Sequence, residues 1–356
     1  MASTTSAPTG ARAALLAAAR DRILLIDGAF GTEIQNRRLT EADYAGALGL
    51  ARDQKGNNDI LALTRPDVPE AIHRAYFEAG VDIAETNTFS ANRISQADYA
   101  AEHLVREINH ESAALARRVA DEFADRDGRR RFVAGAIGPT NKTLSLSPDV
   151  NDPGYREIDF DQLKAVYREQ ADALIAGGAD FILIETIFDT LNAKAGVMAA
   201  GEAADALGRD VPIMLSMTLT DLSGRNLSGH TVEAFWHAVR HARPVTIGLN
   251  CSFGAEQLRP HVRTLAALAD TLIMVYPNAG LPNELGEYDE APATTAGLVG
   301  EWAQDGLVNV LGGCCGSTPA HIRAIAAAVK GLPPRALPTP PVRTRLAGLE
   351  PFTMAA

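Results

Sequence analysis

The chain has 356 residues, of which 46% are hydrophobic and 22% are charged, a composition typical of a globular enzyme. Its formal net charge of -11 argues against a nucleic-acid-binding protein, because phosphate contacts require clustered Lys and Arg. No stretch approaches the roughly 20 apolar residues of a membrane span. The length fits two average domains or one large α/β barrel, since such barrels commonly run to roughly 250 residues or more.

The first 20 residues are rich in Ala, Ser and Thr and hold no acidic residue before Asp21, a composition that also occurs in transit peptides. Residues 13–20 nevertheless have a helical pattern and lead directly into an aliphatic run at 23–26. We therefore interpret them as the first helix of the folded chain. Three cysteines, an odd number without a signal peptide, indicate a reducing compartment, and we expect the protein to be cytoplasmic.

One pattern recurs along the chain: a short aliphatic or β-branched run, a loop containing Gly, Asn, Thr or Cys, and an Ala-rich helical stretch. The runs expected to form strands are residues 23–26, 81–84, 132–137, 181–184, 213–217, 245–249, 272–276 and 308–311. Helical patterns between them include residues 70–79, 101–123, 160–176, 191–207, 232–241 and 256–267. Such alternation specifies parallel strands, and eight repeats predict a single (β/α)₈ TIM barrel.

Four segments depart from this repeat. Residues 32–63 and 140–159 form long loops after the first and third strands, and long loops at the catalytic face of a barrel are commonly lids or substrate contacts. The Arg run at residues 129–131 follows two acidic residues in a polar turn, which favours a solvated loop. The chain becomes Pro-rich near its end, so we expect the barrel at residues 1–332 and a linker-like tail at 333–356.

The residues just past each strand are the candidates for chemistry, because active sites of this fold lie at the C-terminal ends of the strands. They are Asp27, Glu85, Asn87, Glu185, Asn250, Cys251, Asn278, Cys314 and Cys315. Cys314 and Cys315 follow a Gly-Gly turn and precede a helix that Ser317 or Thr318 is expected to cap, with Pro319 in its first turn. The positive end of that helix favours thiolates.

The three cysteines suggest a zinc site at this face. Thiolates are soft ligands, and three protein ligands leave the fourth tetrahedral position open for a substrate. The spacing contains no CxxC pair, and adjacent cysteines are an unusual way to ligate one ion, so a vicinal disulfide or simple buried thiols are the alternatives. The glycines at residues 28–31 and 135–138 lack the GxGxxG spacing of a dinucleotide site.

Four motifs together carry a family resemblance: DGAFGT at residues 27–32, ETNTF at 85–89, GLNC at 248–251 and GGCCGSTPAHI at 312–322. They resemble the zinc-dependent homocysteine S-methyltransferase family and, within it, the homocysteine-binding modules of cobalamin-dependent methionine synthases. The likeness extends from about residue 12 into the Pro-rich tail.

The resemblance implies a role for each matching residue. It implies zinc ligation by Cys251, Cys314 and Cys315, with Asn278 as a candidate fourth ligand before substrate binds. Homocysteine would be held through its ammonium and carboxylate groups. The residues implied are Asp27 and Glu185 for the ammonium, and the backbone N–H groups of Ala29, Phe30, Gly31 and Thr32 for the carboxylate.

The expected reaction is the synthesis of methionine. The resemblance implies that the thiolate of zinc-bound homocysteine attacks the methyl group of methylcobalamin, which a separate cobalamin- and folate-binding partner protein carries. One alternative is a self-sufficient enzyme that uses S-methylmethionine or betaine as the methyl donor. The other is a non-catalytic zinc-binding module that serves an assembly.

Overall fold

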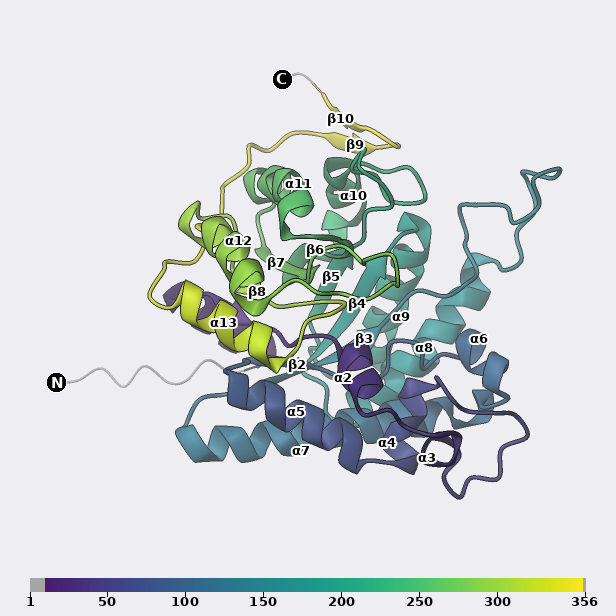
Figure 1. The fold of residues 1–356 in the computed structure, drawn as a ribbon. Coiled ribbons are helices and arrows are strands. Elements are labelled where there is room, and N and C mark those ends of the chain that lie inside the picture. Colours follow the sequence, from purple (N-terminus) through teal and green to yellow (C-terminus); the bar gives the residue numbers. More distant parts are fainter. Residues whose placement is uncertain (1–9, 355–356) are drawn as a thin grey trace.

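The computed structural model describes residues 10–354, which form a barrel of eight parallel strands surrounded by helices (Figure 1). The strands are β1 (Leu24–Leu25), β2 (Ile83–Glu85), β3 (Phe132–Ile137), β4 (Phe181–Ile187), β5 (Ile213–Met217), β6 (Thr246–Gly254), β7 (Leu272–Asn278) and β8 (Val310–Leu311). Their order is β1-β8-β7-β6-β5-β4-β3-β2, and a parallel bridge between Ile26 and Ile83 joins the two ends. The predicted single (β/α)₈ TIM barrel is confirmed; residues 1–9 and 355–356 of the expected barrel and tail lie outside the described residues.

The helices that follow the strands form the outer layer of the barrel (Figure 1). They are α5 (Asp67–Ala79), α7 (Val105–Asp127), α8 (Phe160–Ala176), α9 (Thr190–Ala206), α10 (Val232–Val239), α11 (Ala255–Leu268), α12 (Pro292–Gln304) and α13 (Pro319–Val329). α1 (Ala11–Asp21) precedes the first strand and belongs to the folded chain, as expected for residues 13–20. No helix within residues 10–354 combines the length and apolar character needed to cross a membrane.

The core has two layers because successive strand side chains point to opposite faces. Phe132 and Phe181 point into the barrel, where their ring centroids lie 5.5 Å apart, and Leu15 of α1 packs in the same cluster. Val133 and Ile182 belong instead to the cluster between strands and helices. α1 therefore contributes to the packing inside the barrel, while the outer helices cover its outside.

The long segment after β1 has more regular structure than the sequence pattern indicated. It contains α2 (Phe30–Asn36), α3 (Glu41–Ala45) and α4 (Leu61–Thr64). The segment between β3 and α8 has no helix or strand and projects away from the barrel at the right of Figure 1. Both segments lie after strand ends, so they border the C-terminal face.

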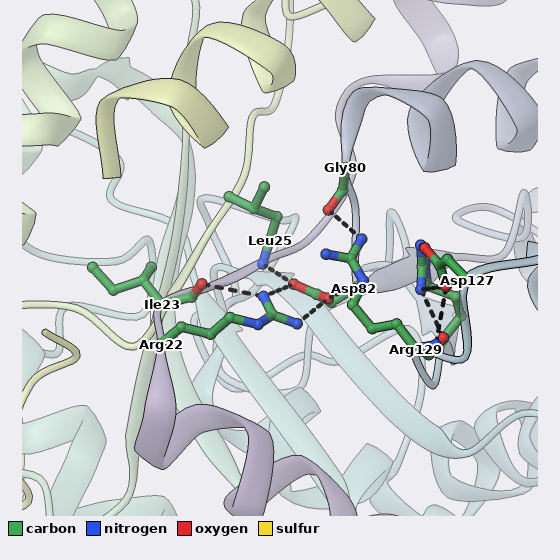
Figure 2. A network of polar contacts seen from close by, with 8 residues as sticks. Arg22, Ile23, Leu25, Gly80, Asp82, Asp127 and Arg129 are labelled. Atoms are coloured by element: carbon green, nitrogen blue, oxygen red, sulfur yellow. Dashed lines mark hydrogen bonds and ion pairs between the residues drawn. The ribbon is translucent and has the colours of Figure 1, made fainter. Parts of the chain in front are cut away.

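Side chains at the opposite end fix the strands relative to one another. Asp82 directly precedes β2 and is 1% exposed. It accepts hydrogen bonds from the Arg22 guanidinium at 2.6 and 2.7 Å and from the Leu25 backbone N–H of β1 at 3.0 Å (Figure 2). This one carboxylate thus joins the end of α1, β1 and β2.

A polar side chain also accepts a hydrogen bond from a neighbouring strand at two other strand starts. Asp180, before β4, accepts a hydrogen bond from the Val133 N–H of β3 at 2.9 Å. Asn309, before β8, accepts one from the Ile273 N–H of β7 at 2.9 Å. Each side chain satisfies a backbone donor that the neighbouring ladder leaves unpaired. Polar residues before the strands therefore set the register at this end.

The expectation that residues 129–131 form a solvated loop holds for Arg130, which is exposed, but is wrong for Arg131, which is buried. Arg129 donates to the Gly80 carbonyl at 3.2 Å, and its Nε lies 3.7 Å from Asp82 (Figure 2). Arg131 is 2% exposed and pairs with Asp127 at 2.7 Å. The turn between α7 and β3 folds under the barrel, and each of its three arginines lies beside a carboxylate, since Arg130 is 3.5 Å from Asp180.

The tail lies against the barrel at two places. The Arg335 guanidinium is buried and donates to the Ala266 carbonyl of α11 at 2.9 Å and to the Thr271 carbonyl at 3.0 Å. Further along, β9 (Arg345–Ala347) and β10 (Pro351–Thr353) form an antiparallel hairpin beside α10 (Figure 1). The Thr231 N–H donates to the Leu349 carbonyl of this hairpin at 3.1 Å.

The Asp82 network predicts a large loss of stability in Asp82→Ala. Removing the carboxylate leaves the Leu25 N–H buried without a partner and Arg22 without its counter-ion, which should lower the free energy of unfolding by about 3 kcal/mol. Urea denaturation measures the change. The control is Asp121→Ala, which removes an exposed i,i+4 partner of Arg117 and should cost less than about 1 kcal/mol. Equal losses in the two variants would contradict the role given to Asp82.

Candidate functional site

A cavity of about 1240 Å³ opens among the loops that follow the strands. The predicted residues in its wall are Ala29, Phe30, Gly31, Thr32, Glu85, Asn87, Glu185, Cys251, Cys314 and Cys315. Asp27, Asn250 and Asn278 are buried directly behind this wall. The structure therefore brings the candidates from six strand ends to one place, as the barrel topology predicts.

The three cysteine sulfurs gather at one side of the cavity. All three Sγ atoms lie within 4.8 Å of one another, and those of Cys251 and Cys315 are 3.8 Å apart. Cys251 has a φ of 61° where the register of β6 shifts against β7, so the strand bends at the thiol. The turn that carries the other two thiols contains Gly316, whose φ is 79° and where a Cβ would overlap Tyr288.

The three thiols shift one another's pKa values. Hydrogen bonds from Cys251 and Cys314 lower the pKa of Cys315 to about 3. Hydrogen bonds with its two neighbours raise the pKa of Cys314 well above the usual value. The hydrogen bond with Cys314 lowers the pKa of Cys251, but the hydrogen bond with Cys315 and burial raise it by more. The pKa of Cys251 therefore rises to about 11. Three soft sulfur donors this close together, of which Cys315 gives up its proton most readily, fit Zn²⁺.

Three carboxyl groups lie at the same cavity as the thiols: Asp27 and Glu185 are buried, and Glu85 is partly buried. The Glu85 N–H donates to Asp27 Oδ2 at 3.0 Å, whereas Asp27 Oδ1 is buried without a hydrogen-bond partner among the described residues. The Tyr276 hydroxyl donates to Glu185 Oε2 at 3.1 Å. Burial raises the pKa of Asp27 and Glu85 well above the usual range and that of Glu185 to about 7. Such a cluster attracts a cation, which would relieve the cost of ionising buried acids.

The start of α2 places backbone donors at the same cavity. The first intrahelical bond runs from Glu33 N–H to the Ala29 carbonyl at 3.2 Å, so the N–H groups of Phe30, Gly31 and Thr32 have no acceptor within the helix. The Ala29 N–H already donates to Ser317 Oγ at 3.2 Å. Three of the four predicted carboxylate-binding groups are therefore open to a ligand.

Asn278 ends β7, which lies between β6 with Cys251 and β8, whose following turn carries the other two thiols. Its Oδ1 accepts a hydrogen bond from the Cys315 backbone N–H at 3.1 Å, and its Nδ2 donates to the Tyr288 hydroxyl at 3.5 Å. Asn278 thus lies beside the thiol cluster, and its side chain holds the backbone of Cys315.

The chain matches the family model of the homocysteine S-methyltransferases over residues 24–329. It belongs to the homocysteine S-methyltransferase family. The assignment makes the chain a methyltransferase and homocysteine the substrate of its family. Among solved structures, it is similar to the metallated form of the homocysteine methyltransferase MmuM from Escherichia coli, with 24% identity and a TM-score of 0.69 over 89% of this chain and 99% of that one. The oxidized form of MmuM gives 24% identity and a TM-score of 0.67, over 86% and 95%.

The sequence pattern did not identify several residues of this site. Tyr288 lies in the loop after β7 and contacts Asn278 and the Gly316 turn. Tyr276 sits within an apolar strand, so the pattern marks it as core although its hydroxyl holds Glu185. His321 lies in the motif at residues 312–322 and also lines the cavity. It is buried and accepts the Thr318 N–H at 3.2 Å in the capping box of α13.

Asp59 lies on the wall of the cavity formed by the segment after β1. Its side chain is 5% exposed, and Oδ1 accepts a hydrogen bond from the Ser90 N–H at 3.2 Å. Burial raises the pKa of Asp59 to about 7. Because the folded state holds this proton more tightly than the unfolded state, the contribution of Asp59 to stability falls as pH rises from about 4 to 7.

Asp59→Asn is therefore expected to stabilise the chain, relative to the wild type, more at pH 8 than at pH 5. The amide keeps an acceptor for the Ser90 N–H and removes the buried charge, so the gain at pH 8 should approach, but not exceed, about 4 kcal/mol. Thermal unfolding at the two pH values measures the difference. Asp98→Asn, at an exposed acid of the same wall, is the control and should shift Tm equally at both. A pH-independent effect of Asp59→Asn would contradict the burial argument.

Proposed function

We propose that the chain binds zinc through Cys251, Cys314 and Cys315 and converts homocysteine to methionine. The observation that carries this proposal is the meeting of three thiols within 4.8 Å in a cavity that Glu85 and Glu185 also line, with Asp27 buried behind its wall. The thiols supply soft ligands and leave one tetrahedral position free. The carboxyl groups supply the complement of an amino-acid ammonium group.

The thiol of free homocysteine resembles that of free cysteine, whose pKa is about 8.5, so it is mostly protonated at neutral pH. When bound, zinc supplies positive charge that lowers the pKa of a coordinating thiol and keeps it deprotonated. Three cysteinate ligands would leave the site with a net charge of about minus one. Such a site is suited to holding a nucleophilic sulfur rather than to activating water.

The protein residues orient the amino-acid end of homocysteine. We propose that Asp27 and Glu185 accept hydrogen bonds from the ammonium group, with Glu85 as a third carboxyl neighbour. Ammonium binding would favour the ionised forms of these acids and release protons that burial now retains. The free N–H groups at the start of α2 would bind the carboxylate, and Asn278 remains the candidate fourth zinc ligand before substrate enters.

The reaction consists of one methyl transfer. The homocysteine sulfur gives an electron pair to the methyl carbon, a C–S bond forms, and the bond between the methyl group and its donor breaks. The electron pair of that bond stays with the donor, and the thiol proton has already left. The product sulfur is a thioether, a weak ligand, so methionine should be released.

We propose methylcobalamin on a separate cobalamin- and folate-binding protein as the methyl donor. Exposed apolar side chains at the cavity support a protein partner: Phe89 lines the cavity and is 41% exposed, and Leu285, next to the lining residue Gly286, is 83% exposed. In this proposal, the barrel ends near residue 332 and residues 333–356 are a linker-like tail. A self-sufficient enzyme that uses S-methylmethionine or betaine is the alternative.

A donor comparison tests the proposal. The zinc-loaded chain should form methionine from homocysteine and free methylcobalamin, and Cys314→Ala should reduce the rate by at least about 100-fold through loss of a ligand. Exposed Met198→Ala is the control for an ordinary substitution and should leave the rate unchanged.

The outcomes separate the parts of the proposal. Turnover with S-methylmethionine or betaine, and none with methylcobalamin, would reject the cobalamin partner and retain the zinc chemistry. Full activity in Cys314→Ala would reject the zinc site itself.

A further inference from the structure

Asn250 lies behind the cavity wall and contacts the thiol cluster from within the barrel. It is fully buried in β6, at the last paired position before the register shift. Its Oδ1 accepts hydrogen bonds from the Thr186 backbone N–H at 3.1 Å and from Ser216 Oγ at 2.7 Å. Its Nδ2 donates to Thr186 Oγ1 at 2.9 Å and points to Cys314 Sγ at 3.9 Å. One side chain therefore joins β4, β5, β6 and the turn after β8.

The Thr186 backbone fixes which way the Asn250 amide points. A backbone N–H only donates, so the atom 3.1 Å from it must be the amide oxygen. The other end is then the NH₂ group, which also only donates. The Cys314 sulfur consequently faces a donor and acts as the acceptor of an N–H···S hydrogen bond. A sulfur that accepts such a bond is favoured in its anionic or metal-bound form.

The same amide stabilises backbone that is otherwise strained. Thr186 has a φ of 53° and Cys251 a φ of 61°, and each such conformation costs a non-glycine residue about 1–3 kcal/mol. Asn250 bonds both the backbone and the hydroxyl of Thr186, and it is the residue before Cys251. Thr186 in turn follows Glu185. Asn250 thus couples a substrate-side carboxyl, one thiol by chain connection and a second thiol by hydrogen bonding.

We propose that Asn250 is a positioning residue for the metal site: its amide holds the Cys314 sulfur as a hydrogen-bond acceptor at a set distance from the strand that carries Glu185. The inference rests on the proposed metal role of Cys314. It goes beyond the assignment of ligands, because it identifies the buried side chain that orients Cys314 and favours the anionic or metal-bound form of its sulfur. Partners of metal ligands typically change metal affinity by about 10- to 100-fold when removed.

Asn250→Asp isolates the sulfur contact. Either carboxylate oxygen accepts from the Thr186 N–H and from Ser216, and the Thr186 hydroxyl can turn to donate to the other. Only the Cys314 sulfur loses its N–H donor and faces a carboxyl oxygen instead. Ser216→Ala is the matched control, because it removes one hydrogen bond to the same amide and touches no sulfur.

The readout is Co²⁺ bound in place of zinc, with affinity measured by chelator competition and the sulfur-to-cobalt charge-transfer band by absorption. We expect Asn250→Asp to bind Co²⁺ about 10- to 100-fold more weakly, with the band moved to longer wavelength because the sulfur lone pair is no longer stabilised by a donor. Ser216→Ala should keep the wild-type affinity and band. Thermal unfolding of each metal-free chain checks that the variants are folded.

Each outcome decides the proposal. Wild-type affinity and band position in Asn250→Asp would overturn it, as would equal effects in Ser216→Ala. If Asn250→Asp does not fold, Asn250→Ser is judged by the same criteria, and failure of both to fold would show that Asn250 serves the fold alone. A wild-type chain without any sulfur-to-cobalt band would overturn the proposed metal site as well.

Discussion

The closure of the barrel is the constraint on which the site depends. Cys251 lies in the bent C-terminal part of β6 and the Cys314–Cys315 pair follows β8, so the two sulfur-bearing segments are separated in the sheet by β7 alone. Asn278 at the end of β7 spans that gap through the Cys315 backbone. The thiols meet because adjacent parallel strands deliver their following loops to one rim, and no contact between residues near in sequence would achieve this.

The two ends of the barrel differ in how their charges are satisfied. At the N-terminal end, Asp82 and Asp127 pair with arginines, and the strand starts are tied by side-chain hydrogen bonds. At the C-terminal end, Asp27, Glu85 and Glu185 have no basic partner within residues 10–354, and Thr186 and Cys251 have positive φ values. The paired end stabilises the fold, and the unpaired end leaves charge and donors available to a ligand. This division is expected where strained or unsatisfied groups serve function.

The sequence allowed the barrel, the common rim and the position of the three thiols to be predicted, since periodicity locates strands and strand ends converge in this fold. The helices within residues 30–64 were missed because they are short and their apolar spacing is weak. The buried state of Arg131 depends on how the turn before β3 folds under the barrel, which charge patterning does not reveal. The Asn250 and Tyr288 contacts join residues distant in the chain through side-chain geometry, so only the structure identifies them.

The central claim is that three protein sulfurs hold a metal ion and leave one position for the sulfur of homocysteine. X-ray absorption at the zinc edge, recorded on the zinc-loaded chain before and after homocysteine is added, tests this directly. The account predicts three sulfur neighbours in the free form and four with homocysteine, and loss of one sulfur in both states of Cys314→Ala. An unchanged sulfur count on adding homocysteine, or a free form already holding four sulfurs, would contradict it.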